Sequence, residues 1–281
     1  MSAGFAPGLG SYAFRWSIGH GDRVPPRPMT AMEVLEFGIA HGARVVQFAD
    51  NMRVHALENP ALDALAVRAI AADVALEVGM QGWDEGLAAR YLEVARRLGA
   101  RIVRVALDAA DDRKDLGPLA DALRRAAGEA AAQGARVAVE NHFGFPSPRL
   151  VALLEAVDHP AIGVCLDVGN SICGGEWPRE TIRLLAPWTI NLHLKDWDIL
   201  PDPYGVGFRI HGTPWGEGRT DAGAVLRALE GRPAMSVIYE HWLPWPGDVD
   251  AARAQERDWT ARGLAAFRAL LCEGDRAQAS R

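Results

Sequence analysis

The chain has 281 residues, of which 49% are hydrophobic and 23% charged, with a formal net charge of −6 and a pI near 5.8. This acidic balance excludes an overall cationic field that would hold a polyanion, so it disfavours nucleic acid as the main partner. The length is typical of a single barrel domain of eight β/α units, which needs roughly 250 residues.

The first half of the chain alternates short apolar runs with helical patterns. A first strand is predicted at 10–14, close to Trp16, and the helix after it begins with a capping box formed by Thr30 and Glu33. The further strands of this half are predicted at 44–48, 75–79 and 102–107, and its further helices at 61–71, 87–98 and 116–133.

The second half repeats the same cycle, with β-rich runs in VAVENH, IGVCLDVGN, NLHLKDW and SVIYEHW. Eight strands alternating with eight helices predict an α/β fold, a single (β/α)8 TIM barrel over residues 1–272. An open doubly wound sheet is the alternative, but no Gly-rich fingerprint follows the first strand. The segment 273–281 is predicted to be a disordered tail.

The longest connection runs from Trp197 to Asp221. It contains Pro201, Pro203 and five glycines, so it cannot form a regular helix. A loop of this length within a compact domain is usually a lid or a binding loop. Because it follows His193 closely, we expect it to cover the site described next.

Four successive strand ends carry residues of metal-ligand type: Glu140, Asp167, His193 and Glu240. A single glutamate at a strand end is more often solvated or ion-paired, but four such residues in a row are hard to obtain by chance. Strand alternation puts them on inward columns, and neighbouring strands lie roughly 4.8 Å apart at the barrel rim. Three carboxylates and one imidazole predict one divalent cation. The oxygen-rich set favours Mn²⁺ over Mg²⁺, Co²⁺ or Zn²⁺.

Further residues are candidates for substrate binding: His142, Lys195, Arg209, His211 and Trp16. Lys195 shares the inward face of the ligand histidine, although an ion pair with a neighbouring carboxylate is an equal alternative. His142 is a candidate acid or hydrogen-bond donor. Arg209 and His211 lie in the predicted lid, where simple exposure is the alternative for the arginine. Trp16 would either face a sugar ring or pack.

The motifs VAVENH, LDVGN, HLKDW, PWGEG and YEHW, in this order on a barrel pattern, resemble the sugar-phosphate isomerase/epimerase superfamily, also called xylose isomerase-like TIM barrels. The resemblance covers most of the chain and specifies the superfamily, not the substrate. It implies that the four strand-end residues are the metal ligands. In the ketose 3-epimerase branch it also implies that Glu140 and Glu240 form the proton-transferring pair. Family members are often dimers or tetramers, which points to a homo-oligomer.

These observations predict a metal-dependent isomerase or epimerase of a small ketose, keto-polyol or related hydroxy-carbonyl sugar. Proton transfer would pass through a metal-bound enediolate, with one glutamate removing a proton and the other returning it. The alternative is a metal-dependent lyase or dehydratase of a keto-inositol, keto-glycoside or dehydroshikimate-like substrate. There, His142 or Lys195 would protonate a departing oxygen.

Two other classes are disfavoured. Zinc-dependent apurinic endonucleases share the fold, but Asn170 stands where that family carries histidine, and Arg209 replaces an expected aspartate. A non-catalytic sugar sensor would tolerate the loss of a catalytic base, yet both glutamates are present. The expected partner is therefore a small sugar or polyol, with neither nucleic acid nor membrane.

The cysteines and the first residues indicate the compartment. Cys165, Cys173 and Cys272 form no CxxC pair and suggest no disulfide framework. We find no basic segment followed by an apolar run at the start, and no uninterrupted apolar stretch of about 18 residues. The sequence therefore predicts a cytoplasmic protein.

Overall fold

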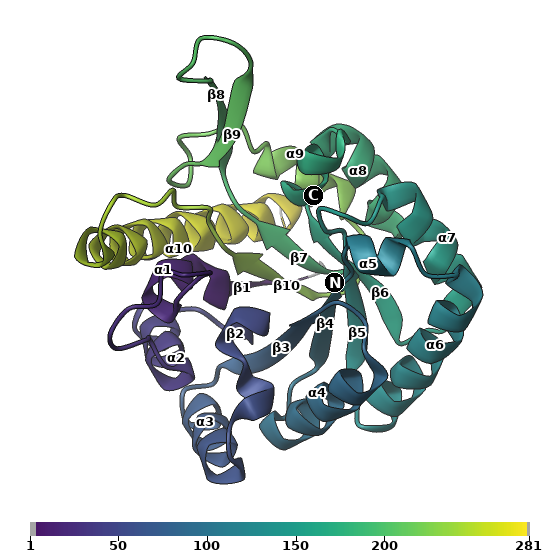
Figure 1. Cartoon of the computed structure of the whole chain (residues 1–281). Coiled ribbons are helices and arrows are strands. Elements are labelled where there is room, and N and C mark those ends of the chain that lie inside the picture. The colour runs from purple at the N-terminus through teal and green to yellow at the C-terminus, as the bar shows by residue number, and fades with distance from the viewer. Residues whose placement is uncertain (1–3, 280–281) are drawn as a thin grey trace.

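Eight parallel strands close into a barrel in the order β1-β10-β7-β6-β5-β4-β3-β2 (Figure 1). The computed structural model describes residues 4–279, with the side chains of 272–279 left out of the description. The predicted TIM barrel is confirmed. The barrel strands are β1 (Phe5–Gly10), β2 (Val45–Phe48), β3 (Ala75–Gln81), β4 (Ile102–Ala106), β5 (Arg136–Glu140), β6 (Ile162–Asp167), β7 (Thr189–Leu194) and β10 (Met235–Tyr239).

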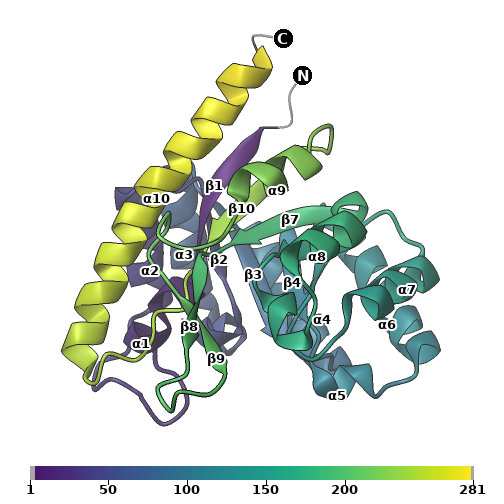
Figure 2. The same cartoon turned by 90° about the horizontal axis from the view of Figure 1, so that it is seen from above.

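Helices surround the barrel, and α10 lies along one side of it (Figure 2). The predicted capping box at Thr30 is present, because its hydroxyl accepts from the Glu33 amide at 3.2 Å. The helices are α1 (Arg15–Ile18), α2 (Ala31–Ala40), α3 (Asn59–Ala71), α4 (Glu85–Leu98), α5 (Ala109–Asp112), α6 (Leu116–Ala132), α7 (Ser147–Val157), α8 (Pro178–Leu185), α9 (Ala222–Ala228) and α10 (Val249–Ala279). Short 3-10 turns are η1 (Ser11–Phe14), η2 (Asp50–Met52), η3 (Val54–Ala56), η4 (Asn170–Gly174) and η5 (Ala186–Trp188).

The first strand lies five residues earlier than predicted, at Phe5–Gly10, and the predicted segment 10–14 is mostly the turn η1. Two glycines explain the error, because glycine usually marks a turn. Here they make close packing inside the barrel possible. A Cβ at Gly8 would lie 2.5 Å from Ile238 Cδ1, and one at Gly10 would lie 2.5 Å from Glu240 Oε1. Strand β1 is therefore glycine-rich because larger side chains from β10 fill the space beside it.

The segment after β7 is more ordered than the sequence predicts. It forms an antiparallel hairpin of β8 (Trp197–Pro201) and β9 (Phe208–Gly212), which projects beyond the ring of helices (Figure 1). The buried carboxylate of Asp196 gathers the loop that follows. It accepts the backbone N–H groups of Gly216 and Gly218 at 2.9 Å and that of Thr220 at 3.0 Å. The carboxylate of Asp196 thus holds the base of the hairpin and its following loop together.

Helix α10 continues to Ala279, so the backbone is helical over most of the segment predicted as a tail. Residues 280–281, and the side chains from 272 onward, lie outside the described residues. The domain boundary at residue 272 stays a prediction. Within 4–279, no helix combines the length and the apolar character that crossing a membrane requires.

Glu256 fastens α10 to the short helix α1. Its buried carboxylate accepts the backbone N–H of Trp16 at 2.7 Å and that of Ser17 at 2.9 Å, and the Ser17 hydroxyl donates to it at 2.6 Å. Burial, opposed by these hydrogen bonds, raises the pKa of Glu256 from its ordinary value of 4.5 to about 7. The carboxyl group therefore takes up a proton more readily in the folded chain than in the unfolded one.

We expect Glu256→Gln to flatten part of the pH dependence of stability. A pKa raised by folding gives stability that is complete below the unfolded value and is lost as pH rises through the folded value. The stability of the wild-type protein relative to this variant should therefore fall by about 3 kcal/mol between pH 4.5 and pH 8. Urea unfolding of both proteins across this range measures the effect. If the free energy of unfolding of the two proteins changes with pH in the same way, Glu256 does not titrate as described.

Candidate metal centre and active site

The four predicted ligands converge at the C-terminal end of the barrel, and all four are buried. His193 Nδ1 lies 3.6 Å from Glu240 Oε2 and 3.9 Å from Asp167 Oδ2. Its distance from Glu140 Oε1 is 4.0 Å. Strands β5, β6, β7 and the end of β10 thus bring one side chain each to a common centre, as their inward registers predict.

This cluster fits a divalent cation. Single donor atoms of Asp167, His193 and Glu240 lie within 4.8 Å of one another. Both ring nitrogens of His193 and Glu240 Oε1 are buried and have no hydrogen-bond partner among the described residues. Leaving such groups unpaired costs roughly 1–3 kcal/mol each, which coordination of a cation would remove. Donor atoms of Glu140, Cys165 and His193 also lie within 4.8 Å of one another, so the buried thiol of Cys165 borders the same centre.

Two asparagines that are not among the predicted site residues position the carboxylates. Asn141 links neighbouring strand ends, donating to the Asp167 carbonyl at 2.6 Å and accepting from its amide at 2.8 Å. Asp167 Oδ1 accepts the amides of Gly169 and Asn170, which leaves Oδ2 to face the cluster. Asn170 Nδ2 donates to Glu140 Oε1 at 2.7 Å. The motifs VENH and LDVGN therefore carry orienting groups as well as ligands.

Lys195 lies against the same cluster. Its Nζ is 2.6 Å from Asp167 Oδ2, 3.3 Å from Glu240 Oε2 and 4.8 Å from the centre of the Trp242 ring. Burial disfavours its charge, but the carboxylates outweigh burial and raise the pKa of Lys195. Lys195 is therefore an ammonium ion that borders the centre. It pairs with carboxylates, which is one of the two alternatives that the sequence leaves open. Its contact with substrate stays a prediction.

Arg104 is a second buried cation, which our site prediction omitted. It projects inward from β4 and forms an ion pair with Glu140, and its Nη1 lies 3.3 Å from Asp50 Oδ1. Tyr12 donates to the other oxygen of Asp50 at 2.8 Å. In the sequence, this role is indicated only by the presence of an arginine within the apolar run IVRVA. Only the fold shows that it faces the centre.

The cations reduce the basicity of both glutamates. Burial acts to raise the pKa of Glu140, but Arg104 and His193 lower it below its ordinary value. Burial likewise opposes ionisation of Glu240, yet His193 and Lys195 hold its pKa well below the usual range. A bound divalent cation would lower both further. Each glutamate is thus a good ligand and a weak proton acceptor.

His142 lies at the edge of the centre. Its ring packs on Phe143, with centroids 4.5 Å apart, and Phe143 in turn lies 6.2 Å from the Trp242 ring. Burial lowers the pKa of His142, although Glu140 opposes this, so the imidazole is neutral at pH 7. The structure therefore brings His142 close to the candidate ligands, and its role stays a prediction.

Arg209 and His211 contact the hairpin rather than the candidate ligands. Arg209 has a largely exposed side chain and pairs with Asp202 at 3.4 Å. His211 Nδ1 lies 2.9 Å from the carbonyl of Gly212. Among residues 4–271, we find no contact between these two residues and the candidate ligands, so their predicted contribution to the centre stays unsupported.

Trp16 packs inside the protein. It is 6% exposed, its Nε1 donates to the Leu243 carbonyl at 2.8 Å, and its ring meets that of Trp245 at 5.1 Å. This is the packing alternative that the sequence left open.

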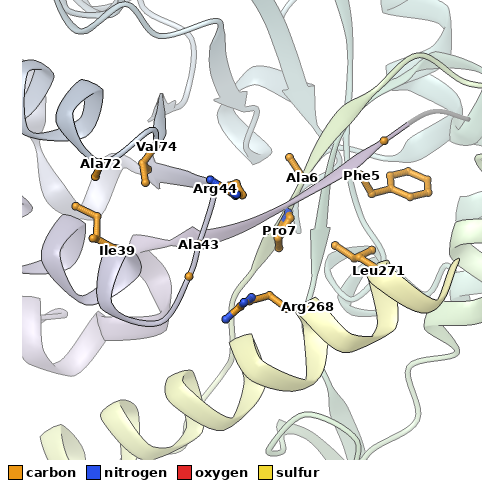
Figure 3. Close-up of a pocket in the computed structure, with 12 residues that line it drawn as sticks. Phe5, Ala6, Pro7, Ile39, Ala43, Arg44, Ala72, Val74, Arg268 and Leu271 are labelled. Carbon is orange, nitrogen blue, oxygen red and sulfur yellow. The ribbon is translucent and has the colours of Figure 1, made fainter. Parts of the chain in front are cut away.

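A separate pocket of about 610 Å³, bordered by Arg44 and Arg268, lies at the opposite, N-terminal end of the barrel (Figure 3).

Comparisons with known proteins agree with this architecture. A family model described as "Xylose isomerase-like TIM barrel" matches residues 87–270. A 3-oxo-isoapionate decarboxylase from Pectobacterium atrosepticum is 32% identical over 260 residues, which cover 92% of this chain and 94% of that protein.

Two solved structures show the same fold. D-psicose 3-epimerase from Clostridium cellulolyticum H10, solved with D-tagatose, is similar at a TM-score of 0.70 and 16% identity over 95% of this chain and 99% of that one. A xylose isomerase-like TIM barrel protein from Mycobacterium smegmatis, in complex with magnesium, has a TM-score of 0.65 and 17% identity over 93% and 96% of the two chains.

Proposed function

The chain belongs to the xylose isomerase-like TIM barrel family, and from this premise we propose that it is a metal-dependent decarboxylase of a small 3-oxo hydroxy acid derived from a sugar. The relative that is 32% identical over nearly the whole length of both chains carries the name of such an activity. The sequence predicts isomerisation, with elimination as the alternative lyase reaction, and loss of CO₂ is not among its predictions.

The pairing of both glutamates with cations is the observation that carries this proposal. Glu140 is held by Arg104 and Asn170, and Glu240 lies beside Lys195. An epimerase needs a carboxylate basic enough to remove a proton from carbon, whereas the nearby cations lower the pKa of both glutamates. Decarboxylation needs no base, because the bond to CO₂ breaks and its electron pair moves toward the neighbouring carbonyl. What it requires is positive charge and a proton donor.

The residues of the site can supply both. A divalent cation held by Glu140, Asp167, His193 and Glu240 would, when bound, polarise a substrate oxygen as a Lewis acid. Arg104 and Lys195 add fixed positive charge in a buried environment, where charge acts more strongly than in water. Lys195 Nζ also carries a proton that can pass to the carbon from which CO₂ has left.

The second candidate is the isomerase or epimerase that the sequence predicted. Its support is the placement of Glu140 and Glu240, which approach His193 from strands β5 and β10 and so could flank a substrate. We retain manganese as the proposed cation, and a homo-oligomer in the cytoplasm as the proposed state of the protein.

Isotope exchange with product analysis separates the two reactions. The Mn²⁺-loaded protein is incubated in D₂O with 3-oxo-isoapionate, and separately with D-psicose and D-tagatose. A decarboxylase releases one CO₂ per turnover and places one deuteron on the product carbon that bore the carboxylate. Deuterium in recovered ketose without CO₂ would reject this proposal in favour of epimerisation. Protein treated with a chelator is the control for background decarboxylation.

A further inference from the structure

A cavity of about 610 Å³ lies between α8 and α9, outside the barrel wall. These helices are neighbours in the outer ring (Figure 1). The apolar side chains of Val168, Ile182 and Val225 line it, together with Trp197 from the start of β8. None of the four candidate metal ligands contributes to its wall. Its size falls in the range of small-molecule sites, roughly 300–1,000 Å³.

The charges around this cavity leave a surplus of one positive charge. Arg179 and Arg183 lie one helical turn apart on α8, and neither has an ion-pair partner among the described residues. Arg219 is neutralised by Asp198, with 2.5 Å between Nε and Oδ1. One carboxylate, Asp221, also lines the cavity, where it caps the start of α9. Two free arginines against one aspartate suit a ligand with a single negative charge.

Trp197 adds an unused hydrogen-bond donor. Its side chain is 5% exposed, and its Nε1 has no acceptor among the described residues. The backbone holds it in place, because the Arg219 amide donates to the Trp197 carbonyl at 2.8 Å. A buried N–H without an acceptor costs roughly 1–3 kcal/mol, which a ligand oxygen would recover.

We propose that this cavity binds a small monocarboxylate with an apolar body. The carboxylate would face Arg179 and Arg183 and accept the Trp197 Nε1–H, while the apolar body packs on Val168 and Ile182. A multiply charged phosphate matches neither the single surplus charge nor the apolar wall. Binding at this place does not depend on which reaction the barrel catalyses.

The test follows the indole N–H signals of the intact protein during a titration with 4-phenylbutyrate. The chain has nine tryptophans, and Trp197→Phe identifies the signal of Trp197 by its loss. We expect that signal to shift and saturate, and the neutral analogue 4-phenylbutyramide to bind at least about tenfold more weakly. If the signal is unmoved at about 10 mM ligand, or if acid and amide bind equally, the assignment is wrong.

Surface variants locate the binding place. Arg179→Gln and Arg183→Gln should each weaken binding about tenfold, and Ala228→Trp should block the entrance. Arg227→Gln is the matched control, because this arginine is exposed on α9 but does not line the cavity, and it should bind as the wild type does. All four positions are exposed, so folding should be preserved. Wild-type affinity in both α8 arginine variants would overturn the proposal.

Discussion

Replacing Asp167 by Asn is expected to weaken divalent-cation binding at least about 100-fold and to remove activity with it. The substitution keeps the shape of the side chain and an oxygen to accept from Gly169 and Asn170. It removes one of three negative charges and turns the atom that faces His193 into an amide. The loss should therefore reflect coordination rather than misfolding.

To measure this effect, chelator-stripped protein is titrated with Mn²⁺, and binding is monitored by calorimetry and by the EPR signal of free Mn²⁺. Asp202→Asn is the matched control, because Asp202 lies in the hairpin and contacts Arg209 and the Tyr204 amide. An Asp167→Asn protein that binds Mn²⁺ as tightly as the wild type would show that the cluster is not the metal centre.

Replacing Lys195 by Met should lower kcat by about 100-fold to 10,000-fold without weakening cation binding. Methionine keeps the length and the packing against Trp242 but removes the charge and the proton. The cation then no longer competes with an ammonium group 2.6 Å from Asp167 Oδ2, so its affinity should stay the same or rise. A lower kcat with undiminished metal affinity would distinguish the role of Lys195 from that of the metal ligands.

The same variant should be less stable without metal, by about 3 kcal/mol, because Asp167 and Glu240 lose their buried partner. Added Mn²⁺ should restore more stability to the variant than to the wild type in thermal unfolding. Lys114→Met is the control, since Lys114 is the only other lysine of the chain and forms a partly exposed pair with Asp111. Undiminished turnover in Lys195→Met would remove Lys195 from the mechanism.

The candidate ligands could be predicted from the sequence because their positions follow from local rules. A strand alternates its side chains between two faces, and parallel strands end at one rim. Those two rules were enough to bring Glu140, Asp167, His193 and Glu240 together. The same rules placed Lys195 on the correct face.

The contacts of residues whose role depends on a distant neighbour could not be predicted from the sequence. Arg104 acts through Glu140 and Asp50, and no local pattern reveals those partners. Asn141 binds the backbone of the next strand, so it is only visible once β5 and β6 are paired. For Trp16 the sequence leaves two interpretations open, because an aromatic residue near a strand end has the same pattern whether it faces a ligand or the interior.

The hairpin after β7 is joined to the barrel in a way that makes its tip easy to remodel. Asp196 accepts four backbone amides at the base, while the residues between Pro201 and Phe208 take no part in the barrel sheet. Doubling the length of a flexible loop costs only about 0.6 kcal/mol in closure entropy. Insertions, tags or grafted recognition segments at this turn should therefore leave the half-barrel with the candidate metal ligands intact.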